Sequence, residues 1–280
     1  MKILAVIVTY YPDEELLRKN LDAFIEHVEE VMVWDNTPTN AVQNLSFLQR
    51  KEVKIFGEGK NYGISYALNF ALRIATAGEF SHILTMDQDS CWMHFPDFLE
   101  TIKEFNLSEN ICGPSIRKKF PEKMYYKVPY TITSGSLLCV KMLNEIGGFN
   151  ESFFVDHVDM ELCCRAKNFG YDTVIINTGT LVQRFGNPKQ VSWRGKDRFF
   201  YSYPKSRHYE IMRNKVLMLR TFKFSWRYLV KVFITELFFL PFQIILYDDD
   251  KLKKIAAVYR GFISGFFVKV KERYKKTEIC

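Results

Sequence analysis

Apolar runs of strand length alternate with helix-like stretches through residues 1–90. The strand-like runs, which are almost continuously apolar, cover residues 2–10, 31–34, 53–56 and 82–86. Such runs are typical of strands that are buried on both faces of a parallel sheet. Amphipathic stretches at 13–27 and 61–77 follow the first and third of these runs and predict helices. The alternation therefore predicts an α/β fold in which helices cover both faces of a mostly parallel central sheet.

The pattern is less regular after residue 110. It predicts a strand at 131–140, a short helix at 141–146, a helix at 156–169, a strand at 172–176 and a helix at 209–222. The segment 187–203 is expected to be a long loop, which either covers the site as a lid or lies on the surface. We interpret residues 1–220 as one domain and residues 221–280 as a C-terminal helical appendage.

The appendage combines apolar helical faces with positive charge. The stretch 226–247 is just long enough to span a bilayer core of about 30 Å, but Arg227, Lys231 and Glu236 make spanning costly. The stretch 252–274 carries apolar residues at helical spacing, namely Ile255, Tyr259, Phe262, Phe266 and Val270, with lysines and arginines elsewhere. Basic amphipathic helices are typical of membrane surfaces. A homodimer interface is the alternative.

Composition and charge narrow the class of protein. Of 280 residues, 48% are hydrophobic and 25% charged, which excludes a disordered or fibrous chain. The net charge of +7 is uneven, because residues 1–90 hold 8 Lys or Arg against 13 Asp or Glu, whereas residues 221–280 hold 12 against 6. The basic tail is strongly apolar, so we expect a membrane surface and no nucleic acid. The N-terminus resembles a first strand and no signal peptide, so we expect the chain in the cytoplasm, peripheral at the inner face of the cell membrane.

Three polar clusters follow three of the predicted strands. They are Thr9-Tyr10-Tyr11, Asp35-Asn36 and Asp87-Gln88-Asp89. Ligands of parallel sheets bind outside the carboxyl ends of the strands, so we expect these clusters to meet. Asp87 and Asp89 should project to the same side, where two carboxylates suit Mg²⁺ or Mn²⁺ bound to a diphosphate. The sequence has no glycine-rich phosphate loop, so metal and side chains must neutralise that diphosphate.

Together these motifs resemble a family 2 inverting glycosyltransferase of the GT-A fold, which is Rossmann-like, with a pattern similar to bacterial rhamnosyltransferases. The matching segments appear in order over roughly residues 1–220, at 8–13, 33–36, 61–69, 84–90, 133–136, 147–161 and 213–214. The resemblance implies a nucleotide-binding half at 1–90 and an acceptor and catalytic half at 91–220.

The resemblance also implies roles for individual residues. The nucleotide-sugar would be bound by Thr9, Tyr11, Asp35, Asn61, Gly63, Asp87, Ser134, Gly135 and Ser136. Asp89 and Asp87 would face the metal, and Asp159 would be the general base. Sugar transfer builds negative charge on the leaving diphosphate, which a metal and nearby cations stabilise. The acceptor hydroxyl needs a carboxylate to take its proton, on the face opposite the leaving group.

Several assignments stay open at this point. The family often has Glu-Asp where this chain has Val158-Asp159, so Asp156, one helical turn earlier, competes as the base; it is also expected as the N-cap of its helix. Glu161 is expected to pair with Arg165 four residues later. Asp159 is preferred as the base.

The third metal ligand and the cation at the diphosphate are open too. Gln183 stands where many relatives have a metal-binding histidine, and His208 is a substitute ligand or a surface residue. Arg213 either reaches the diphosphate or pairs with Glu210.

The function expected from the resemblance is metal-assisted, inverting transfer of a sugar, with L-rhamnose as the suggested sugar. The donor would be a dTDP- or UDP-sugar, and the acceptor a cell-surface glycan or a lipid-linked precursor. A nucleotide-sugar pyrophosphorylase is one alternative, although it would need a glycine-rich, basic first loop. A catalytically silent, membrane-docked scaffold of the same fold is the other.

Overall fold

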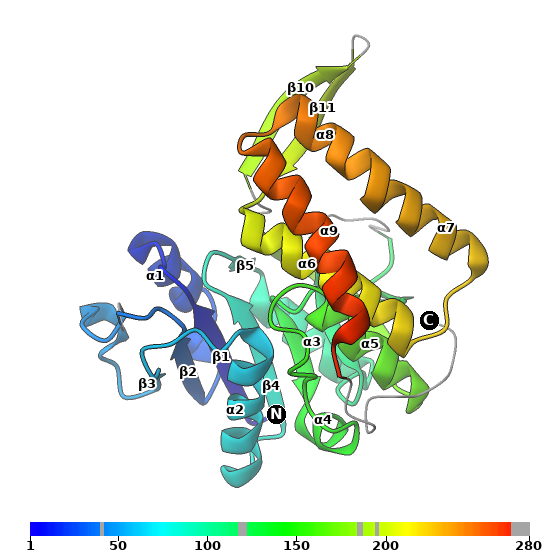
Figure 1. Cartoon of the computed structure of the whole chain (residues 1–280). Helices are drawn as coiled ribbons and strands as arrows, with labels where there is room; N and C mark the ends of the chain where they lie inside the picture. Colours follow the sequence, from blue (N-terminus) through cyan, green and yellow to red (C-terminus); the bar gives the residue numbers. More distant parts are fainter. Residues whose placement is uncertain (40–41, 117–121, 184–186, 194–195, 270–280) are drawn as a thin grey trace. The chain divides into compact units, whose positions relative to one another are not determined.

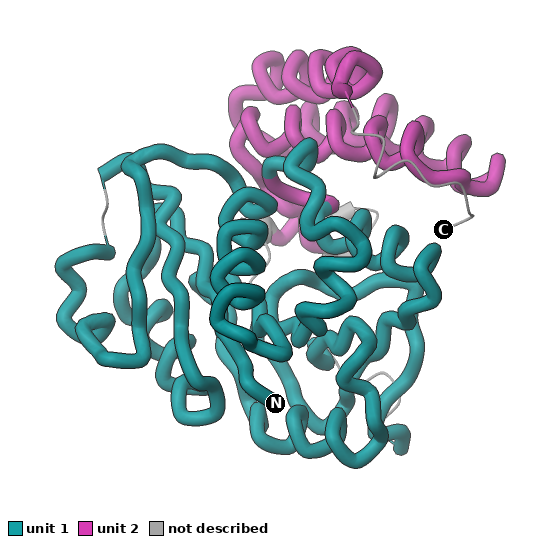
Figure 2. The backbone as a smooth tube through the Cα atoms, turned by 90° about the horizontal axis from the view of Figure 1, so that it is seen from below, with its two compact units in different colours: residues 1–154, 158–183 teal, residues 155–157, 184–280 magenta. Residues whose placement is uncertain are grey.

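The computed structural model describes residues 1–39, 42–116, 122–183, 187–193 and 196–269 of the chain. The chain forms two compact units (Figure 2). Unit 1 comprises Met1–Phe154 and Val158–Gln183, and unit 2 comprises Val155–His157 and Arg184–Cys280.

Unit 1 is an α/β domain with a nine-stranded sheet (Figure 1). The strands are β1 (Ile3–Thr9), β2 (Glu30–Asp35), β3 (Val53–Phe56), β4 (His82–Asp87), β5 (Cys91–Met93), β6 (Ile111–Ser115), β7 (Tyr125–Val128), β8 (Ser136–Cys139) and β9 (Thr173–Val182). The helices are α1 (Glu14–Asp22), α2 (Ile64–Ala77), α3 (Phe95–Glu104), α4 (Val140–Glu145) and α5 (Val158–Asn168), with 3₁₀ turns at Ile25–His27 and Ser46–Leu48. The strand order is β3-β2-β1-β4-β8-β6-β9-β5, and β7 pairs with β9.

The first half of the sheet is parallel, as the apolar runs predicted. β1 pairs in parallel with β2 and β4, and β2 pairs in parallel with β3. β8 enters antiparallel to β4, and β9 is parallel to β6 but antiparallel to β5 and β7. The second half is therefore mixed, which explains why the apolar pattern is less regular after residue 110.

Helices cover both faces of this sheet. Ile3, Ala5 and Ile7 of β1 share a hydrophobic cluster with the apolar faces of α1 and α3. The alternate residues Leu4 and Val6 are fully buried as well, and α2 packs against β1 and β4. Since successive residues of a strand point to opposite faces, α1 and α3 lie on one face and α2 lies on the other.

The helix that contains Arg165, α5, starts later than the sequence predicted. Asp156 and His157 have φ values of +60° and +61°, in the left-handed region, so α5 begins only at Val158. The prediction of Asp156 as the helix N-cap is therefore wrong, and Asp156 is not on the helical face that carries Asp159. The side chain of Asp156 instead binds Arg207 within unit 2, through Nη2 to Oδ1 at 2.9 Å and Nε to Oδ2 at 3.1 Å.

Unit 2 is a hairpin followed by helices. Its elements are β10 (Asn187–Trp193), β11 (Lys196–Ser202), α6 (Lys205–Thr221), α7 (Trp226–Ile234), a π-helical turn η3 (Thr235–Phe239), α8 (Leu240–Tyr247) and α9 (Lys251–Phe267). β10 and β11 pair antiparallel over their whole length, so the expected long loop at 187–203 is a β-hairpin. The sequences of the two strands, NPKQVSW and KDRFFYS, lack a clear alternation of apolar and polar residues, which explains why the hairpin was not predicted.

Within unit 2, α6 packs along α9, so residues on both sides of position 220 belong to the same compact unit. A Cβ on Gly261 would lie 2.4 Å from the backbone oxygen of Tyr209, and one on Gly265 would lie 2.6 Å from Cβ of Val216. Only glycine allows two helix backbones to approach this closely. The spacing of the two glycines, four residues apart, places both on the face of α9 that α6 covers.

Replacing Gly265 by valine should lower the free energy of unfolding by about 1–3 kcal/mol, because the added methyl groups force α6 and α9 apart. Urea unfolding followed by circular dichroism measures this change. Ala256→Val adds methyl groups at an exposed position of the same helix and should change stability by less than about 1 kcal/mol. Equal losses in the two variants would contradict close packing at Gly265.

Candidate active site

The carboxyl ends of β1, β2 and β4 lie at the same edge of the sheet. Thr9 pairs with Asp35 in the β1–β2 register, and Val8 pairs with Asp87 in the β1–β4 register. The hydroxyl of Thr9 donates to Oδ1 of Asp35 at 3.1 Å. The expectation that the three strand-end clusters meet is therefore confirmed.

Asp35 organises the turn after β2. Its buried carboxylate accepts hydrogen bonds from the backbone N–H of Thr37 at 2.9 Å and of Val42 at 3.3 Å, in addition to the Thr9 hydroxyl. The Thr37 hydroxyl in turn accepts from the backbone N–H of Tyr11. Tyr11 sits at φ +47° and its side chain is 58% exposed. Asp35 thus fixes a turn that presents the Tyr11 ring at the sheet edge.

Gln88, the middle residue of the strand-end triplet, holds β1 and β4 together at their carboxyl ends. Its Oε1 accepts from the backbone N–H of Tyr10 at 2.6 Å, and its Nε2 donates to the backbone oxygen of Tyr10 at 3.1 Å. A side-chain amide carries one acceptor and one donor group, so it can satisfy both backbone groups of one residue. The sequence analysis assigned no role to Gln88, although its position between two site carboxylates was a usable signal.

Asn36 connects the end of β2 to the 61–63 turn. Its Oδ1 accepts from the backbone N–H of Tyr62 at 3.1 Å, and its Nδ2 donates to the backbone oxygen of Gly63 at 3.3 Å. Asn61 closes the turn by accepting from the N–H of Gly63 at 2.9 Å. Gly63 has φ +82°, and a Cβ there would lie 2.5 Å from the backbone oxygen of Phe154. A side chain at position 63 would therefore collide with the chain's own backbone.

A hydrogen-bonded network holds Asp87. The hydroxyl of Ser134 accepts from the backbone N–H of Asp87 at 3.0 Å and lies 2.8 Å from the hydroxyl of Ser90. Ser90 donates to Oε1 of Gln183, whose Nε2 donates to Oδ2 of Asp87 at 3.0 Å. The backbone N–H of Gly135 donates to the oxygen of Thr85 at 2.6 Å. The structure therefore brings Asp87, Ser134 and Gln183 together from three distant segments.

The donor set at this edge fits a hard cation only in part. Among the residues that the structure describes, no group of three or more His, Cys, Asp or Glu side chains is arranged to hold a metal. Magnesium is commonly bound by one or two carboxylates, with substrate phosphates and water as its other ligands. Asp87 and Asp89, two residues apart at the end of β4, are the carboxylates available for such a site. Both polar atoms of the Gln183 amide are engaged by Ser90 and Asp87.

Asp159 lies in the first turn of α5, beside the segment that carries Ser134. Its Oδ1 accepts from the backbone N–H of Met160 at 2.8 Å. It lines a small cavity together with Thr133 and Ser136. Because Ser134 binds Asp87 and is two residues from Ser136, Asp159 faces the same segment that holds the strand-end carboxylate.

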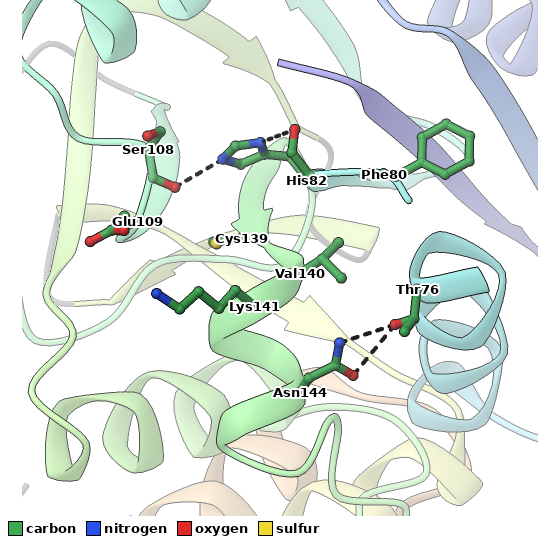
Figure 3. Close-up of a pocket in the computed structure, with 10 residues that line it drawn as sticks. Thr76, Phe80, His82, Ser108, Glu109, Cys139, Val140, Lys141 and Asn144 are labelled. Atoms are coloured by element: carbon green, nitrogen blue, oxygen red, sulfur yellow. Dashed lines mark hydrogen bonds between the residues drawn. The ribbon is translucent and has the colours of Figure 1, made fainter. Parts of the chain in front are cut away.

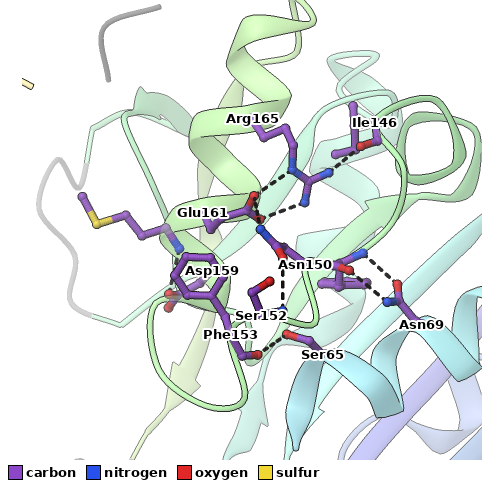
Figure 4. A network of polar contacts seen from close by, with 11 residues as sticks. Ser65, Asn69, Ile146, Asn150, Ser152, Phe153, Asp159, Glu161 and Arg165 are labelled. Carbon is purple, nitrogen blue, oxygen red and sulfur yellow. Dashed lines mark hydrogen bonds and ion pairs between the residues drawn. The ribbon is translucent and has the colours of Figure 1, made fainter. Parts of the chain in front are cut away.

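A buried ion pair supports this turn of α5 (Figure 4). Glu161 and Arg165 have side chains that are each 1% exposed, and Nε and Nη2 of Arg165 donate to Oε1 and Oε2 of Glu161 at 2.9 and 2.8 Å. Nη1 of Arg165 donates to the backbone oxygen of Ile146 at 2.5 Å, and Asn150 Nδ2 lies 3.4 Å from Oε1 of Glu161. The expected pairing is confirmed, and it also ties α5 to the loop that precedes it.

That loop is fixed to α2 by side chains of α2. The hydroxyl of Ser65 donates to the backbone oxygen of Phe153 at 2.6 Å. Asn69 donates to the backbone oxygen of Phe149 at 2.9 Å and accepts from its N–H at 2.7 Å (Figure 4). The 149–153 segment before Asp159 therefore has a defined position in unit 1.

The other candidate residues lie in unit 2. Arg213 forms an ion pair with Glu210, from Nη2 to Oε2 at 2.8 Å, and donates to Oδ1 of Asn214, so its expected pairing with Glu210 is confirmed. Burial raises the pKa of Glu210, and the charge of Arg213 opposes that rise. His208 is buried, and this burial lowers its pKa, so its interpretation as a surface residue is wrong.

A cavity of about 410 Å³ lies at the opposite edge of the unit 1 sheet (Figure 3). It is bordered by His82, which begins β4, and by Cys139, which ends the antiparallel β8. Both ring nitrogens of His82 are engaged, by the Ser81 hydroxyl at 2.8 Å and the Ser108 oxygen at 3.0 Å, and burial lowers its pKa. None of the strand-end clusters lines this cavity, so it is not the candidate active site.

Comparisons with known proteins identify the family of the chain. A family model described as glycosyl transferase family 2 matches residues 5–163. The dTDP-rhamnosyl transferase RfbF of Shigella flexneri is 30% identical over 246 residues, which are 78% of this chain and 80% of that protein.

Solved structures show a likeness in fold. A crystal structure of GalNAc-T7 with UDP, GalNAc and Mn²⁺ has a TM-score of 0.61 at 12% identity, covering 95% of this chain and 56% of that one. A structure of TarS from S. aureus has a TM-score of 0.49 at 15% identity, covering 78% of this chain and 40% of that one. The chain thus spans less than two thirds of each of these proteins. Because the family model covers more than half of its residues, the chain belongs to glycosyl transferase family 2, and its fold is the GT-A fold expected from its motifs.

Proposed function

We propose that this glycosyltransferase transfers L-rhamnose, with inversion, from a dTDP-linked donor to a cell-surface glycan or a lipid-linked precursor. The name of the 30% identical relative supports the donor. The observation that carries the proposal is the network that fixes Asp87 beside Asp89, with Asp159 next to the segment of Ser134 and Ser136. A pyrophosphorylase is not supported, because β1 leads into Thr9-Tyr10-Tyr11 without a glycine-rich loop.

In this proposal the donor lies along the carboxyl edge of β1, β2 and β4. The exposed ring of Tyr11 stacks on the base, which needs a flat apolar surface at that edge. Asp35 and Asn36 act indirectly, since their polar atoms hold the turns that carry Tyr11 and Gly63. Asp87 faces the ribose, and Ser134 and Ser136 border the sugar.

Asp87 and Asp89 would hold the divalent metal, with the diphosphate completing its ligands. A bound Mg²⁺ or Mn²⁺ would neutralise the charge that develops on the leaving diphosphate. Gln183 keeps the carboxylate of Asp87 in place through its amide, and Ser90 keeps the amide of Gln183 in place. Such supporting contacts commonly contribute tenfold to a hundredfold in metal affinity.

Asp159 accepts the proton of the acceptor hydroxyl while that oxygen attacks the anomeric carbon. The bond from the anomeric carbon to the diphosphate oxygen breaks, and the dTDP leaves with its electron pair. We assign the base to Asp159 because it lines a cavity with Thr133 and Ser136 in unit 1, whereas Asp156 belongs to unit 2, where Arg207 binds its carboxylate. Arg213 binds Glu210 and Asn214 within unit 2, so in this proposal we assign it no role in this step.

Donor binding tests the proposal directly. We expect dTDP-L-rhamnose with Mn²⁺ to raise the melting temperature of the full chain more than UDP-sugars do, and to bind about tenfold or more weakly after Asp89→Ala, because a carboxylate ligand is lost. Thermal shift identifies the donor, and calorimetry measures its affinity.

Asp97→Ala is the matched control, because Asp97 is an exposed carboxylate in the first turn of α3. It should leave donor affinity unchanged. Full affinity for the donor in excess EDTA, or in the Asp89→Ala variant, would exclude a required metal at this edge. A preference for UDP-sugars would overturn the dTDP assignment and leave the metal assignment intact.

A further inference from the structure

The helical segment from α7 through η3 to α8 is strongly apolar although most of it is exposed to solvent. Among the described residues, one helix, Trp226–Tyr247, is long and apolar enough to cross a membrane by length and composition, with a mean hydropathy of 2.0 over its most apolar window. Only 17% of that window is buried. The side chains of Trp226 and Phe238 are 76% and 68% exposed. Such a surface is unfavourable in water and indicates a partner.

One side of this helix packs within unit 2, which argues against a helix that crosses the membrane. Pro241 and Ile244 are buried, and Leu237 and Leu240 pack on a cluster that includes residues of α6 and α9. Glu236 is bound to Lys215 of α6, in an ion pair that is largely shielded from solvent. Crossing a bilayer would require the helix to leave this cluster and to carry Glu236, Arg227 and Lys231 into hydrocarbon.

The opposite side of the helix is an exposed apolar stripe. Ile234, Phe238, Phe242 and Ile245 follow one another at spacings of three or four residues and are all exposed. This spacing places them on one side of a helix. Two further aromatic and aliphatic residues, Phe239 and Leu246, are exposed next to the stripe.

α9 repeats this arrangement. Its exposed apolar residues are Leu252, Tyr259, Ile263, Phe266 and Phe267. The apolar face that the sequence predicted for this helix is partly buried within unit 2, because Ile255 and Phe262 pack on the unit 2 cluster. Val270, which was assigned to the same face, lies outside the described residues. The hydroxyl of Tyr259 donates to the backbone oxygen of Leu237 at 2.9 Å, so the two helices lie side by side.

Exposed cations outnumber exposed anions in the same segment of the chain. The exposed basic residues from 222 to 269 are Lys223, Arg227, Lys231, Lys251, Lys253, Arg260 and Lys269. The exposed acidic residues in the same range are Asp249 and Asp250, since Asp248 is buried against Lys254 and Glu236 is bound to Lys215. Arg227 and Lys231 precede Ile234 and Phe238 at helical spacing, so charge and apolar surface share one side.

We infer that this side of unit 2 docks on an anionic phospholipid bilayer, with both helices lying in the plane of the interface. The stripes enter the boundary of headgroups and acyl chains, and the exposed lysines and arginines bind the lipid phosphates. A second copy of the chain fits less well, because a two-fold interface brings the same patch of each copy together and therefore opposes cation to cation. The fold of unit 2 thus supplies an interaction surface that glycosyl transfer itself does not require.

The test is cosedimentation of the full chain with vesicles of phosphatidylcholine, with and without phosphatidylglycerol. We expect binding to the anionic vesicles alone, and weaker binding as salt rises. Arg227→Gln combined with Lys231→Gln should lower the partition coefficient roughly thirtyfold, since each cation contributes about a factor of five. Phe238→Glu combined with Phe242→Glu should lower it at least as much.

Point variants are used because a chain ending near Arg220 would remove α9 from α6 and unfold the unit. Phe105→Glu is the control, because Phe105 is an exposed aromatic residue of unit 1, at 38%. It should bind vesicles as the unchanged chain does, and melting curves should show that all variants fold. Absence of binding to anionic vesicles overturns the inference. So does a dimer, seen by light scattering, that Phe238→Glu converts to a monomer, and so does membrane binding that survives alkaline extraction, which indicates a span.

Discussion

Replacing Asp159 by asparagine is expected to lower turnover by about a hundredfold or more, with little change in the affinity for the donor. Asparagine keeps the size of the side chain and can still accept from the backbone N–H of Met160, so the first turn of α5 should persist. It cannot take a proton from the acceptor hydroxyl. Steady-state kinetics with dTDP-L-rhamnose measures the loss.

Asp156→Asn is the matched variant for this experiment. It leaves Arg207 with a neutral partner and removes one ion pair of unit 2, whose carboxylate side chain is 18% exposed. We expect a modest loss of stability and most of the activity. If Asp156→Asn abolishes turnover and Asp159→Asn retains it, the assignment of the base is wrong.

Arg165→Ala should lower the free energy of unfolding of unit 1 by about 3–5 kcal/mol, because it leaves the carboxylate of Glu161 buried without its counter-charge. It also leaves the backbone oxygen of Ile146 without its donor. Urea unfolding followed by tryptophan fluorescence measures the change. We expect activity to fall as well, since the pair fixes the turn of α5 that carries Asp159.

Lys19→Ala provides the comparison. Lys19 pairs with Glu15 at the same i,i+4 spacing, but the two side chains are 62% and 77% exposed. That variant should cost less than about 1 kcal/mol. A second comparison is the double replacement Glu161→Met with Arg165→Met, which removes both charges and should regain much of the lost stability. Similar effects of Arg165→Ala and Lys19→Ala would contradict a structural role for the buried pair.

The parallel half of the sheet could be predicted from the sequence because its strands are buried on both faces. β1, β2 and β4 read as nearly unbroken apolar runs, and the parallel register then placed Thr9, Asp35 and Asp87 at one edge. The site residues at the strand ends were predictable for the same reason. A polar residue directly after a buried strand of a parallel sheet must lie at the carboxyl edge of that sheet.

The contacts that arrange this edge could not be predicted. Gln88 binds the backbone of Tyr10, and Gln183 binds Asp87 from a segment 96 residues away. Such contacts depend on side-chain positions in the folded chain, which no local pattern records. The N-cap prediction for Asp156 failed for a similar reason, since Arg207 and Asn214, more than fifty residues later, hold that segment in the left-handed region.

The sequence analysis did not place α6 and α9 together, because the contact between them depends on two glycines of α9. Gly261 and Gly265 appear in the sequence as poor helix residues within an amphipathic pattern, and nothing local indicates that α6 is their partner. The apolar positions of α9 were identified correctly, but the sequence could not separate those that pack on α6 and α8 from those that face outward.

Val155–His157 belong to unit 2, although in the sequence they lie between the two segments of unit 1, and this limits where the chain can be cut. Asn214 donates to the backbone oxygens of Val155 at 2.6 Å and Asp156 at 3.0 Å, so α6 holds two consecutive non-glycine residues in a backbone conformation that each adopts at some cost. A fragment ending at Gln183 would keep this cost and lose the bonds that offset it, directly before α5. The transferase domain is therefore not a separable module, and grafting a different C-terminal region onto it would have to reproduce the Asn214 and Arg207 contacts.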